Sequence, residues 1–347
     1  MRRGRTKGEW AGGAITYEPY SLLRGRPHVM VDGAPALGTV LTLSHWPGTP
    51  TPVALRADLS AQSALRWRES PGPWAGAGLV STDHLDQDGL VSLFAVVWPD
   101  AARQRAARLV EVARAGDFAT FTDRDAARAS FALANLADEE RSPLPGATLA
   151  DPAALTTEAL GRLCELVDHP ERHAEAWAEE DAALAASESA IAEGLIRLEE
   201  VIDVDLAIVS VPSDAPTRLA TRFMARSDGP CHPAAVHNAT TCGRVLYCQG
   251  ARYELVVRYE SWVRLVSRQV APRVDLGPLA SALRAEEVSN LARWSAEPVS
   301  TIVQHMSCPG SDLSPSRVCT LVEDHLRRSP PAWFPASEGR PSVPPGQ

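Results

Sequence analysis

The chain has 347 residues, of which 45% are hydrophobic and 22% are charged, and a formal net charge of -9. This acidic balance argues against a nucleic-acid polymer or an anionic membrane as a partner, because both require concentrated Lys and Arg. No run of about 18 apolar residues occurs, so we expect no membrane span, and six cysteines in so long a chain predict reduced thiols in a cytoplasmic protein.

Short apolar runs alternate with helical patterns in the first part of the chain. Three runs are rich in β-forming residues and predict strands at 28–32, 39–45 and 79–82. Three further segments have helical spacing of apolar residues, at 58–67, 90–97 and 101–115. Asp58 or Ser60 can cap the first helix, and Gly116 can end the third. This alternation predicts an α/β fold with a mostly parallel sheet covered on both faces.

A Pro-containing stretch at 141–146 marks a break, after which residues 156–200 have a helical pattern rich in Ala and Glu. Strands are then expected at 206–211, 244–247 and 253–259, with 262–266 as an extension of the sheet. Helices are expected at 279–294 and 315–327. The predicted organisation is a disordered tail (1–14), an α/β domain (15–145), a helical linker (146–203), a smaller mixed α/β domain that closes over a substrate (204–328) and a Pro-rich tail (329–347).

Side chains that bind metals follow the three strands predicted in the first domain. Asp32 ends the first strand, His45 ends the second, and His84, Asp86 and Asp88 follow the third. Because ligands bind outside the carboxyl ends of parallel strands, these side chains converge if the strands are neighbours. Carboxylates favour Mg²⁺ or Mn²⁺, and imidazole shifts the preference toward Mn²⁺. The pattern predicts one or two such ions, which would activate a water and clamp a phosphoryl oxygen.

Each part of this pattern also has a purely structural interpretation. Asp-rich turns commonly cap helices, and Asp-Gly is a frequent turn dipeptide that allows a tight entry into the next helix. A lone histidine is more often a hydrogen-bonded core residue. The combination of strand-end placement with mixed His and Asp chemistry favours the metal site.

The segment His84-Leu85-Asp86-Gln87-Asp88-Gly89 resembles the first motif of the DHH phosphoesterase superfamily, His-x-Asp-x-Asp-Gly. Val31-Asp32-Gly33 looks like the second motif, Ser44-His45-Trp46 stands where the Asp-His-His motif would fall, and Asp117 looks like the Asp of the fourth. The resemblance implies an α/β fold, phosphoesterase chemistry and six metal ligands: Asp32, His45, His84, Asp86, Asp88 and Asp117. We assign Asp88 and Asp117 as its catalytic carboxylates.

This chain departs from the family pattern in two ways. The order of the motifs is permuted, and Trp46 replaces the second histidine of the third motif, which meets the substrate phosphate in the family. Trp46 is therefore a candidate substrate-binding residue, and substrate recognition must differ. The whole chain also resembles a group of bacterial proteins without an assigned activity.

The second domain offers candidate substrate ligands at two histidines. Cys231-His232-Pro233-Ala234-Ala235 faintly resembles a His-containing phosphate-binding turn of the same family, and His237 can line a cleft. A zinc site is an alternative for five residues: Cys231, His232, His237, Cys242 and Cys248. No Cys-x₂-Cys knuckle supports it, and the alternative interpretation is cysteines packed in a sheet and histidines exposed in a loop.

Two arginines form a further candidate for substrate binding. If a strand runs unbroken over 252–264, Arg258 and Arg264 share one face and could grip a phosphate or carboxylate. The alternative is a solvated face with cross-strand Arg/Glu pairs.

Signatures of several other enzyme classes are absent from the sequence, including the P-loop, the dinucleotide-binding loop, the serine-hydrolase elbow and His-Glu-x-x-His. We therefore expect a metal-dependent hydrolase of a phosphate ester or anhydride that acts on a small anionic substrate such as a small nucleotide. Two alternatives remain: a non-hydrolytic ligand-binding or regulatory protein on a DHH-like scaffold, and a metal-dependent hydrolase of a C–N or C–O bond.

Overall fold

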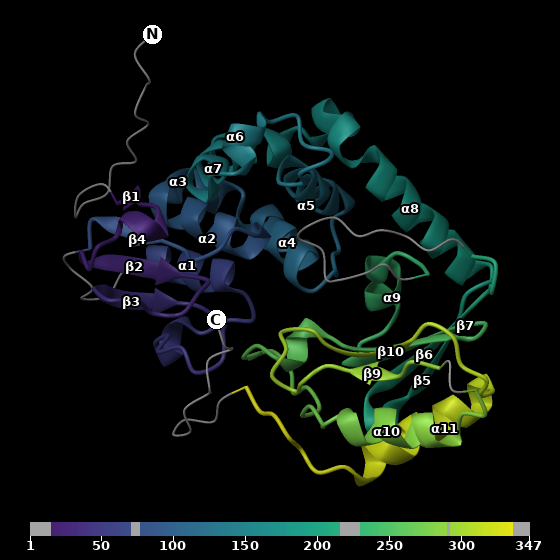
Figure 1. Cartoon of the computed structure of the whole chain (residues 1–347). Coiled ribbons are helices and arrows are strands. Elements are labelled where there is room, and N and C mark those ends of the chain that lie inside the picture. Colours follow the sequence, from purple (N-terminus) through teal and green to yellow (C-terminus); the bar gives the residue numbers. More distant parts are fainter. Residues whose placement is uncertain (1–14, 71–76, 216–229, 290–291, 336–347) are drawn as a thin grey trace.

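The computed structural model describes residues 15–70, 77–215, 230–289 and 292–335. The predicted tail at 1–14 and residues 336–347 of the predicted Pro-rich tail lie outside this part. Two sheets, each with its own helices, lie one above the other in Figure 1, and the long helix α8 (Ala174–Ala192) runs between them. We call the sheet in the N-terminal half of the chain, together with its helices, the first unit. The sheet in the C-terminal half, together with its helices, is the second unit. The fold is α/β, as the sequence predicts.

Within the described residues, the first sheet has four parallel strands in the order β1-β4-β2-β3. Their bounds are Thr16–Tyr17 (β1), His28–Val31 (β2), Thr39–Leu43 (β3) and Leu79–Ser81 (β4). Strand β1 could not be predicted from the sequence, because two residues are too few to show a periodicity. The three predicted strands are neighbours, so their carboxyl ends meet at one edge of the sheet.

Helices pack around this sheet and continue into the connection between the units. Their bounds are Ser60–Glu69 (α1), Gln87–Val97 (α2), Pro99–Gln104 (α3), Ala106–Asp117 (α4), Arg124–Leu136 (α5), Gly146–Leu149 (α6) and Pro152–Asp168 (α7). Every residue of α2 is buried, so it is the central helix of this unit. The single helix predicted at 101–115 is wrong: the chain breaks at Arg105, whose guanidinium binds Asp168 at the end of α7.

Within the described residues, the second sheet is mixed and has six strands in the order β5-β6-β7-β8-β10-β9. The strands are Arg197–Val201 (β5), Leu206–Val211 (β6), Arg244–Gln249 (β7), Arg252–Val257 (β8), Ser295–Ala296 (β9) and Gln304–Cys308 (β10). Helices α10 (Gly277–Glu286) and α11 (Pro315–Arg328) cover one face, and α9 (Pro233–Ala239) lies on the other (Figure 1). In the described part of the chain, no helix combines the length and hydropathy that a membrane span requires.

Two helices predicted in this half of the chain are too long. Residues 197–200 belong to β5 and not to the helix predicted to end at 200. Helix α10 ends at Glu286 and does not reach Trp294. The ring of Trp294 instead stacks on Tyr253 with 5.8 Å between the centroids, inside the core under α10 and α11.

Strand β8 ends at Val257, so the prediction of an unbroken strand over 252–264 is wrong. Val257 pairs with Arg244, the first residue of β7, and with Gln304, the first residue of β10. Neither neighbouring strand extends beyond this pair, so residues after Val257 have no strand to form backbone hydrogen bonds with. The chain turns there through a 3₁₀ helix at Tyr259–Ser261. The expected extension of the sheet at 262–266 does not form either.

Residues 258–267, the crossing segment, carry the chain from the second unit to the first. Trp262 and Val263 are buried in the core of the first unit. The backbone N–H of Arg264 donates to the carbonyl of His45 (2.8 Å), and the carboxylate of Asp58 accepts from the N–H groups of residues 266 and 267. Side-chain burial and hydrogen bonds therefore join the two units here.

The start of the predicted C-terminal tail is also part of the fold. The backbone N–H groups of Ala332 and Trp333 donate to the carbonyl of Arg273, and the ring of Trp333 packs against the core of the first unit. The expectation of an unstructured tail is therefore wrong for residues 329–335.

The replacement Trp262→Ala tests how strongly the crossing segment holds the units together. Trp262 is 3% exposed, so its removal is expected to lower the free energy of unfolding by about 3–5 kcal/mol. Urea denaturation measures the change. Val266→Ala is the control, because Val266 lies on the same segment but is 51% exposed and its loss is expected to cost about 0.5 kcal/mol or less. A loss below about 1 kcal/mol for Trp262→Ala would show that the segment is only loosely docked.

Candidate metal centre

The structure brings the six side chains predicted as metal ligands together at the carboxyl edge of the first sheet. They are Asp32 after β2, His45 after β3, His84 and Asp86 after β4, Asp88 in the first turn of α2, and Asp117 as the last residue of α4. Within the described residues, two groups of three could each hold an ion, and both include Asp32.

The first group consists of Asp32, His84 and Asp86, whose ligand atoms all lie within 4.8 Å of one another. The Nε2 atom of His84 lies 2.9 Å from Oδ2 of Asp86 and 3.4 Å from Oδ2 of Asp32. On the other side of the ring, Nδ1 lies 2.8 Å from Oδ1 of Asp83. A carboxylate behind a ligand histidine fixes the orientation of the ring. Asp83, which the sequence analysis did not single out, therefore positions His84.

The second group consists of Asp32, His45 and Asp88, with the same 4.8 Å limit. The Nε2 atom of His45 lies 3.6 Å from Oδ1 of Asp32 and 3.8 Å from Oδ2 of Asp88. Oδ2 of Asp117 lies 3.4 Å from the same nitrogen. One oxygen of Asp32 faces His84 and the other faces His45. Asp32 therefore has the geometry of a carboxylate that bridges two ions.

A backbone carbonyl fixes the tautomer of His45. Nδ1 lies 2.5 Å from the carbonyl oxygen of Asp58, and because a carbonyl only accepts, Nδ1 carries the hydrogen. Burial lowers the pKa of His45, which favours the neutral ring. The lone pair on Nε2 then faces the carboxylates, where a metal ion would bind.

Ser60 connects three of the ligands, although the sequence indicates it only as a possible helix cap. Its hydroxyl donates to Oδ1 of Asp32 (2.7 Å) and accepts from the backbone N–H of His45 (3.1 Å). Its own backbone N–H donates to Oδ2 of Asp88 (2.7 Å). No local sequence signal could have shown this role, because the three partners lie 15 or 28 residues away.

The N-terminus of α1 is occupied by a carboxylate from α2. The N-cap residue is Leu59, so the predicted caps Asp58 and Ser60 are wrong. The backbone N–H groups of Ser60 and Ala61 donate to the two oxygens of Asp88, each at 2.7 Å. Each carboxylate oxygen has a second lone pair, so Asp88 can still bind an ion.

Asp86 fits both the structural interpretation of the acidic turn, as a helix cap, and the functional one, as a candidate metal ligand. Its Oδ1 accepts from the backbone N–H of Gly89 (2.8 Å) and caps α2, while its Oδ2 faces His84. Gly89 is already the third residue of that helix, so the prediction that it allows a tight turn is wrong. A Cβ at this position would lie 3.2 Å from Asp86 and 3.3 Å from Asp32. The glycine permits the helix to approach the ligands.

Asp32 has a φ of 44°, in the left-handed region that a non-glycine residue rarely adopts. Asp is among the side chains that tolerate this conformation best. Such strain is typical of functional sites, where the surrounding structure holds it in place. Here the hydroxyl of Ser60 holds the carboxylate.

Like charges shift the ionisation of the cluster. Burial, and then Asp86, raises the pKa of Asp32; burial, and then Asp32, raises the pKa of Asp88 well above 3.8. Burial, and then Asp88, also raises the pKa of Asp117 well above 3.8. Burial alone would lower the pKa of His84, but Asp86 and its other acidic neighbours raise it well above 6.5. His84 in turn lowers the pKa of Asp86 to about 2 against the effect of burial.

Two buried carboxylate oxygens accept no hydrogen bond from the described residues: Oδ2 of Asp32 and Oδ2 of Asp117. Buried carboxylates of this kind cost free energy unless a cation pairs with them. Each three-residue group offers carboxylate oxygens and one imidazole nitrogen, a donor set suited to Mn²⁺ or Mg²⁺. The residues present therefore fit a divalent ion.

Tyr259 of the crossing segment reaches this cluster, and the sequence analysis missed it. Its hydroxyl oxygen lies 3.3 Å from Nε2 of His45, and its ring stacks on Trp262 with 5.8 Å between the centroids. Burial, and then Asp117, raises the pKa of Tyr259 well above 10. A tyrosine between two charged residues carries no signal in the sequence that would point to a metal site.

The two arginines of this segment make internal contacts. Arg258 is buried; its guanidinium lies 2.5 Å from Glu260 and donates to the carbonyl of Thr240 at 3.0 Å. Nη2 of Arg264 donates to the carbonyl of Thr49 at 2.9 Å, so it holds the loop after β3. The shared strand face predicted for them does not exist, and their role as an anion clamp stays a prediction.

His232 and His237 are both buried, so the interpretation that places either of them in an exposed loop is wrong. His232 accepts from Ala234 through Nδ1 and lies 3.1 Å from Glu180 of α8 through Nε2. His237 donates through Nδ1 to the carbonyl of Phe118, the residue after Asp117. Burial lowers its pKa well below 6.5. Of the two, His237 is the one that contacts the residue following the predicted ligand Asp117.

The structure gives no support to the zinc interpretation. The groups of described residues that could hold an ion contain none of its five members: Cys231, His232, His237, Cys242 and Cys248. All six cysteines are described, and none of them forms a disulfide bond.

Trp46 lies against the first ligand group. Its ring is 5.2 Å from the ring of His84, with 31° between the planes, and it meets Trp262 edge-on at 5.4 Å. The indole is partly buried, so it covers one side of His84.

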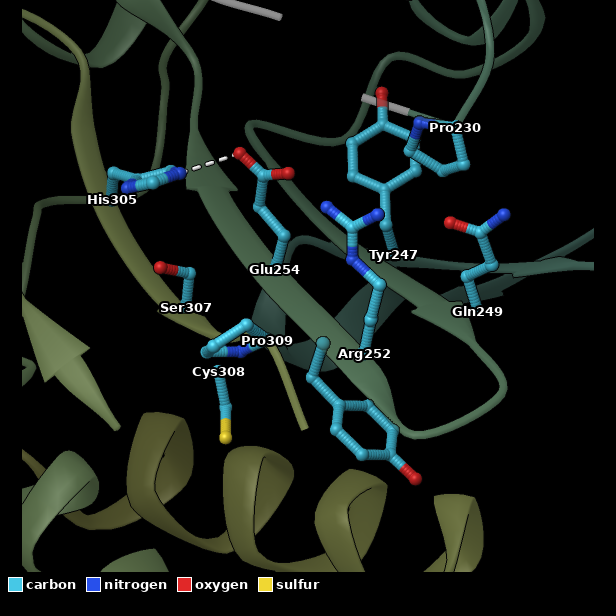
Figure 2. A pocket seen from close by; sticks show the side chains of 10 residues that line it. Pro230, Tyr247, Gln249, Arg252, Glu254, His305, Ser307, Cys308 and Pro309 are labelled. Carbon is cyan, nitrogen blue, oxygen red and sulfur yellow. Dashed lines mark hydrogen bonds and ion pairs between the residues drawn. The ribbon is translucent and has the colours of Figure 1, made fainter. Parts of the chain in front are cut away.

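A separate cavity of ≈ 220 Å³ opens on the second sheet (Figure 2). Arg252 and Glu254, two residues apart on β8, line it together, and Nε2 of His305 lies 2.5 Å from Oε1 of Glu254. None of the predicted metal ligands lines this cavity, so it is distinct from the metal centre.

Comparisons with known proteins reveal the family and no activity. No curated protein and no solved structure matches the chain. A family model described as a family of unknown function, DUF6687, matches residues 13–324. The comparisons give no support to the resemblance to the DHH superfamily. Because the match covers most of the sequence, the chain belongs to the DUF6687 family.

Proposed function

We propose that this protein is a divalent-metal-dependent hydrolase of a phosphate ester or anhydride. The observation that carries the proposal is the pair of ligand groups that share Asp32, together with the buried oxygens of Asp32 and Asp117 that accept no hydrogen bond from the described residues. One or two Mn²⁺ or Mg²⁺ ions would be held by six residues: Asp32, His45, His84, Asp86, Asp88 and Asp117. Two ions in such a site supply an activated water and neutralise charge on a phosphoryl group.

The side chains have separate tasks in this proposal. Asp32, the residue common to both ligand groups, would hold both ions. Asp83 and the carbonyl of Asp58 orient the two ligand histidines from behind. Oδ2 of Asp117, which accepts no hydrogen bond from the described residues, can take a proton from the attacking water, and Asp88 is the second candidate for this task.

The substrate proposed for this site is a small anion such as a small nucleotide. The net charge of -9 disfavours a nucleic-acid polymer. The motif resemblance to DHH phosphoesterases supports phosphoryl chemistry, although Trp46 replaces the histidine that meets the phosphate in that family. Trp46 lies beside His84, where its ring can contact the organic part of a substrate.

Metal analysis of the purified protein, combined with a substrate panel, tests this function. We expect Mn²⁺ or Mg²⁺ to bind with one or two ions per chain and to support hydrolysis of phosphodiesters, pyrophosphate or nucleotides, and EDTA to remove the activity. Asp88→Ala is expected to abolish metal binding. The surface variant Asp100→Ala, at a largely exposed carboxylate, is the control for a lost charge. Unchanged Mn²⁺ affinity in Asp88→Ala would refute the metal site.

Trp46 also favours a second candidate function, a ligand-binding or regulatory protein that binds metal without hydrolysis. In the motif resemblance Trp46 stands in place of a substrate-facing histidine, and its ring packs between His84 and Trp262. In that case the metal-loaded protein binds nucleotides without turning them over, and Trp46→His gains phosphoesterase activity. An amide and a carboxyl ester added to the substrate panel test hydrolysis of a C–N or C–O bond.

A further inference from the structure

We propose that Tyr259 and a metal ion compete for the same lone pair of His45. In the metal-free protein the hydroxyl of Tyr259 hydrogen-bonds to Nε2 of His45. When an ion takes that lone pair, the freed hydroxyl donates to a phosphoryl oxygen of the substrate. The second step rests on the function proposed above, whereas the competition does not.

The direction of the hydrogen bond follows from the contacts of His45. Its Nδ1 must donate, because its partner is the carbonyl of Asp58. A neutral ring then has only a lone pair at Nε2. The hydroxyl of Tyr259, 3.3 Å away, is therefore the donor.

A nitrogen of a neutral imidazole binds a metal through the same lone pair that accepts a hydrogen bond. Nε2 of His45 is the ligand atom that this residue offers to the group with Asp32 and Asp88. The hydrogen bond from Tyr259 and an ion in this group cannot coexist. Ion binding must therefore break the hydrogen bond.

Packing keeps the ring of Tyr259 at the centre after this exchange. It stacks on Trp262 with 5.8 Å between the centroids and meets Phe118 at 6.0 Å and His45 at 5.7 Å. Its hydrogen can rotate about the C–O bond while the oxygen stays close to the ion position. A phosphoryl oxygen held at that ion would then be an available acceptor for this hydrogen.

The residue also links the two units. Tyr259 belongs to the crossing segment, whereas the predicted metal ligands all lie in the first unit. The crossing segment thus brings a hydroxyl group to the acidic cluster of the first unit.

The replacement Tyr259→Phe tests the inference, because it removes the hydroxyl and retains the ring packing. Titration of the metal-free protein with Mn²⁺ is expected to show roughly three- to ten-fold tighter binding, the effect of one lost competing hydrogen bond. Turnover of a phosphodiester by the Mn²⁺-loaded variant is expected to fall about 100-fold, as when one donor to a developing negative charge is removed.

Tyr253→Phe is the matched control. The hydroxyl of Tyr253 donates to the carbonyl of Leu313 at 2.9 Å in the core of the second unit. This variant loses one tyrosine hydrogen bond elsewhere, so its Mn²⁺ affinity and turnover should equal those of the native protein. Thermal unfolding of both variants shows whether they are folded.

Unchanged or weaker Mn²⁺ binding by Tyr259→Phe would overturn the competition. Tighter binding with undiminished turnover would overturn the contact with substrate. If the native metal-loaded protein hydrolyses no phosphate ester or anhydride, the proposed function and the substrate contact fail together, while the Mn²⁺ titration still decides the competition.

Discussion

Replacement of Asp32 by Asn is expected to lower the affinity for Mn²⁺ by at least about 100-fold, because loss of a ligand should exceed the 10–100-fold effect of residues behind the ligands. Asp32 belongs to both ligand groups, so one substitution affects every ion in the centre. The Asn carbonyl can still accept the hydrogen bond from Ser60, and the side chain has the same shape. The loss should therefore come from the missing charge and not from unfolding.

The same variant is expected to be more stable than the native protein when both are metal-free. Burial and Asp86 raise the pKa of Asp32, which means that its charge is unfavourable in the folded state. Removing the charge should raise the melting temperature in EDTA and abolish the further rise that Mn²⁺ gives the native protein. Isothermal titration with Mn²⁺ and thermal melts with and without EDTA measure both effects.

Asp100→Asn is the control for this experiment, since it makes the same chemical change at a carboxylate that is 74% exposed. It should leave both the Mn²⁺ affinity and the melting temperature unchanged. If Asp32→Asn bound Mn²⁺ as tightly as the native protein, the shared-ligand geometry would not describe a metal site.

The stability of the metal-free protein is expected to fall as the pH rises from about 4 toward 8. Asp88 and Asp117 have pKa values well above the ordinary 3.8 in the folded state, so the folded protein holds their protons more tightly than the unfolded chain does. The stabilisation that such a group provides is fully present at pH values below its pKa in the unfolded chain. It is lost as the pH rises through the pKa of the group in the folded protein. The slope is about 1.4 kcal/mol per pH unit for each additional proton held.

His84 acts in the same direction and Asp86 in the opposite one. The pKa of His84 is raised well above 6.5, so its stabilising contribution is lost as the pH rises through that raised value. The pKa of Asp86 is lowered to about 2, so its contribution is present above 3.8 and is lost as the pH falls toward 2. His45 also opposes the trend, because burial lowers its pKa and its contribution is lost as the pH falls below 6.5. The three carboxyl groups with raised pKa values, Asp32, Asp88 and Asp117, outnumber it. The cluster should therefore stabilise the metal-free fold more near pH 4 than near pH 8.

In the presence of Mn²⁺, the stability of the protein is expected to rise with pH instead of falling. The ion takes the place of the protons on the ligands, so it binds more tightly as the pH rises and the protons leave. At an Mn²⁺ concentration of 100 times its dissociation constant, the stabilisation is about 2.7 kcal/mol. Urea denaturation at several pH values, in EDTA and in Mn²⁺, measures both profiles. Asp117→Asn should flatten the EDTA profile. A metal-free profile that rises from pH 4 to 8 would contradict the prediction.

The convergence of the predicted metal ligands could largely be foreseen from the sequence. Asp32, His45 and His84 each stand one to three residues beyond a strand, and the strands are recognisable from short apolar runs. In a parallel sheet, the carboxyl ends of neighbouring strands share an edge, so local patterns suffice to place these side chains together. Asp117 came from the motif resemblance, which located it just after a helix, whereas the structure has it as the last residue of α4.

Residues behind the ligands were not predictable from the sequence. Ser60 and Asp58 looked like competing caps for one helix, but their hydrogen bonds go to β-strand ends, to α2 and to the crossing segment. Tyr259 is 214 residues from His45 in the sequence. No local periodicity carries information about contacts over such separations.

The acidic strand-end site is thus what the sequence by itself determined, because strand pattern, residue chemistry and the rule for parallel sheets are all local or general. Only the tertiary structure decided what completes the site. Strand β8 stops at Val257 because Val257 pairs with the first residue of each neighbouring strand. Beyond this residue the chain leaves the sheet and crosses to the first unit. That crossing brings Tyr259 to His45 and gives Arg258 and Arg264 internal contacts, while their role as an anion clamp stays a prediction. The partner strands, and not the segment's own residues, set where the chain leaves the sheet.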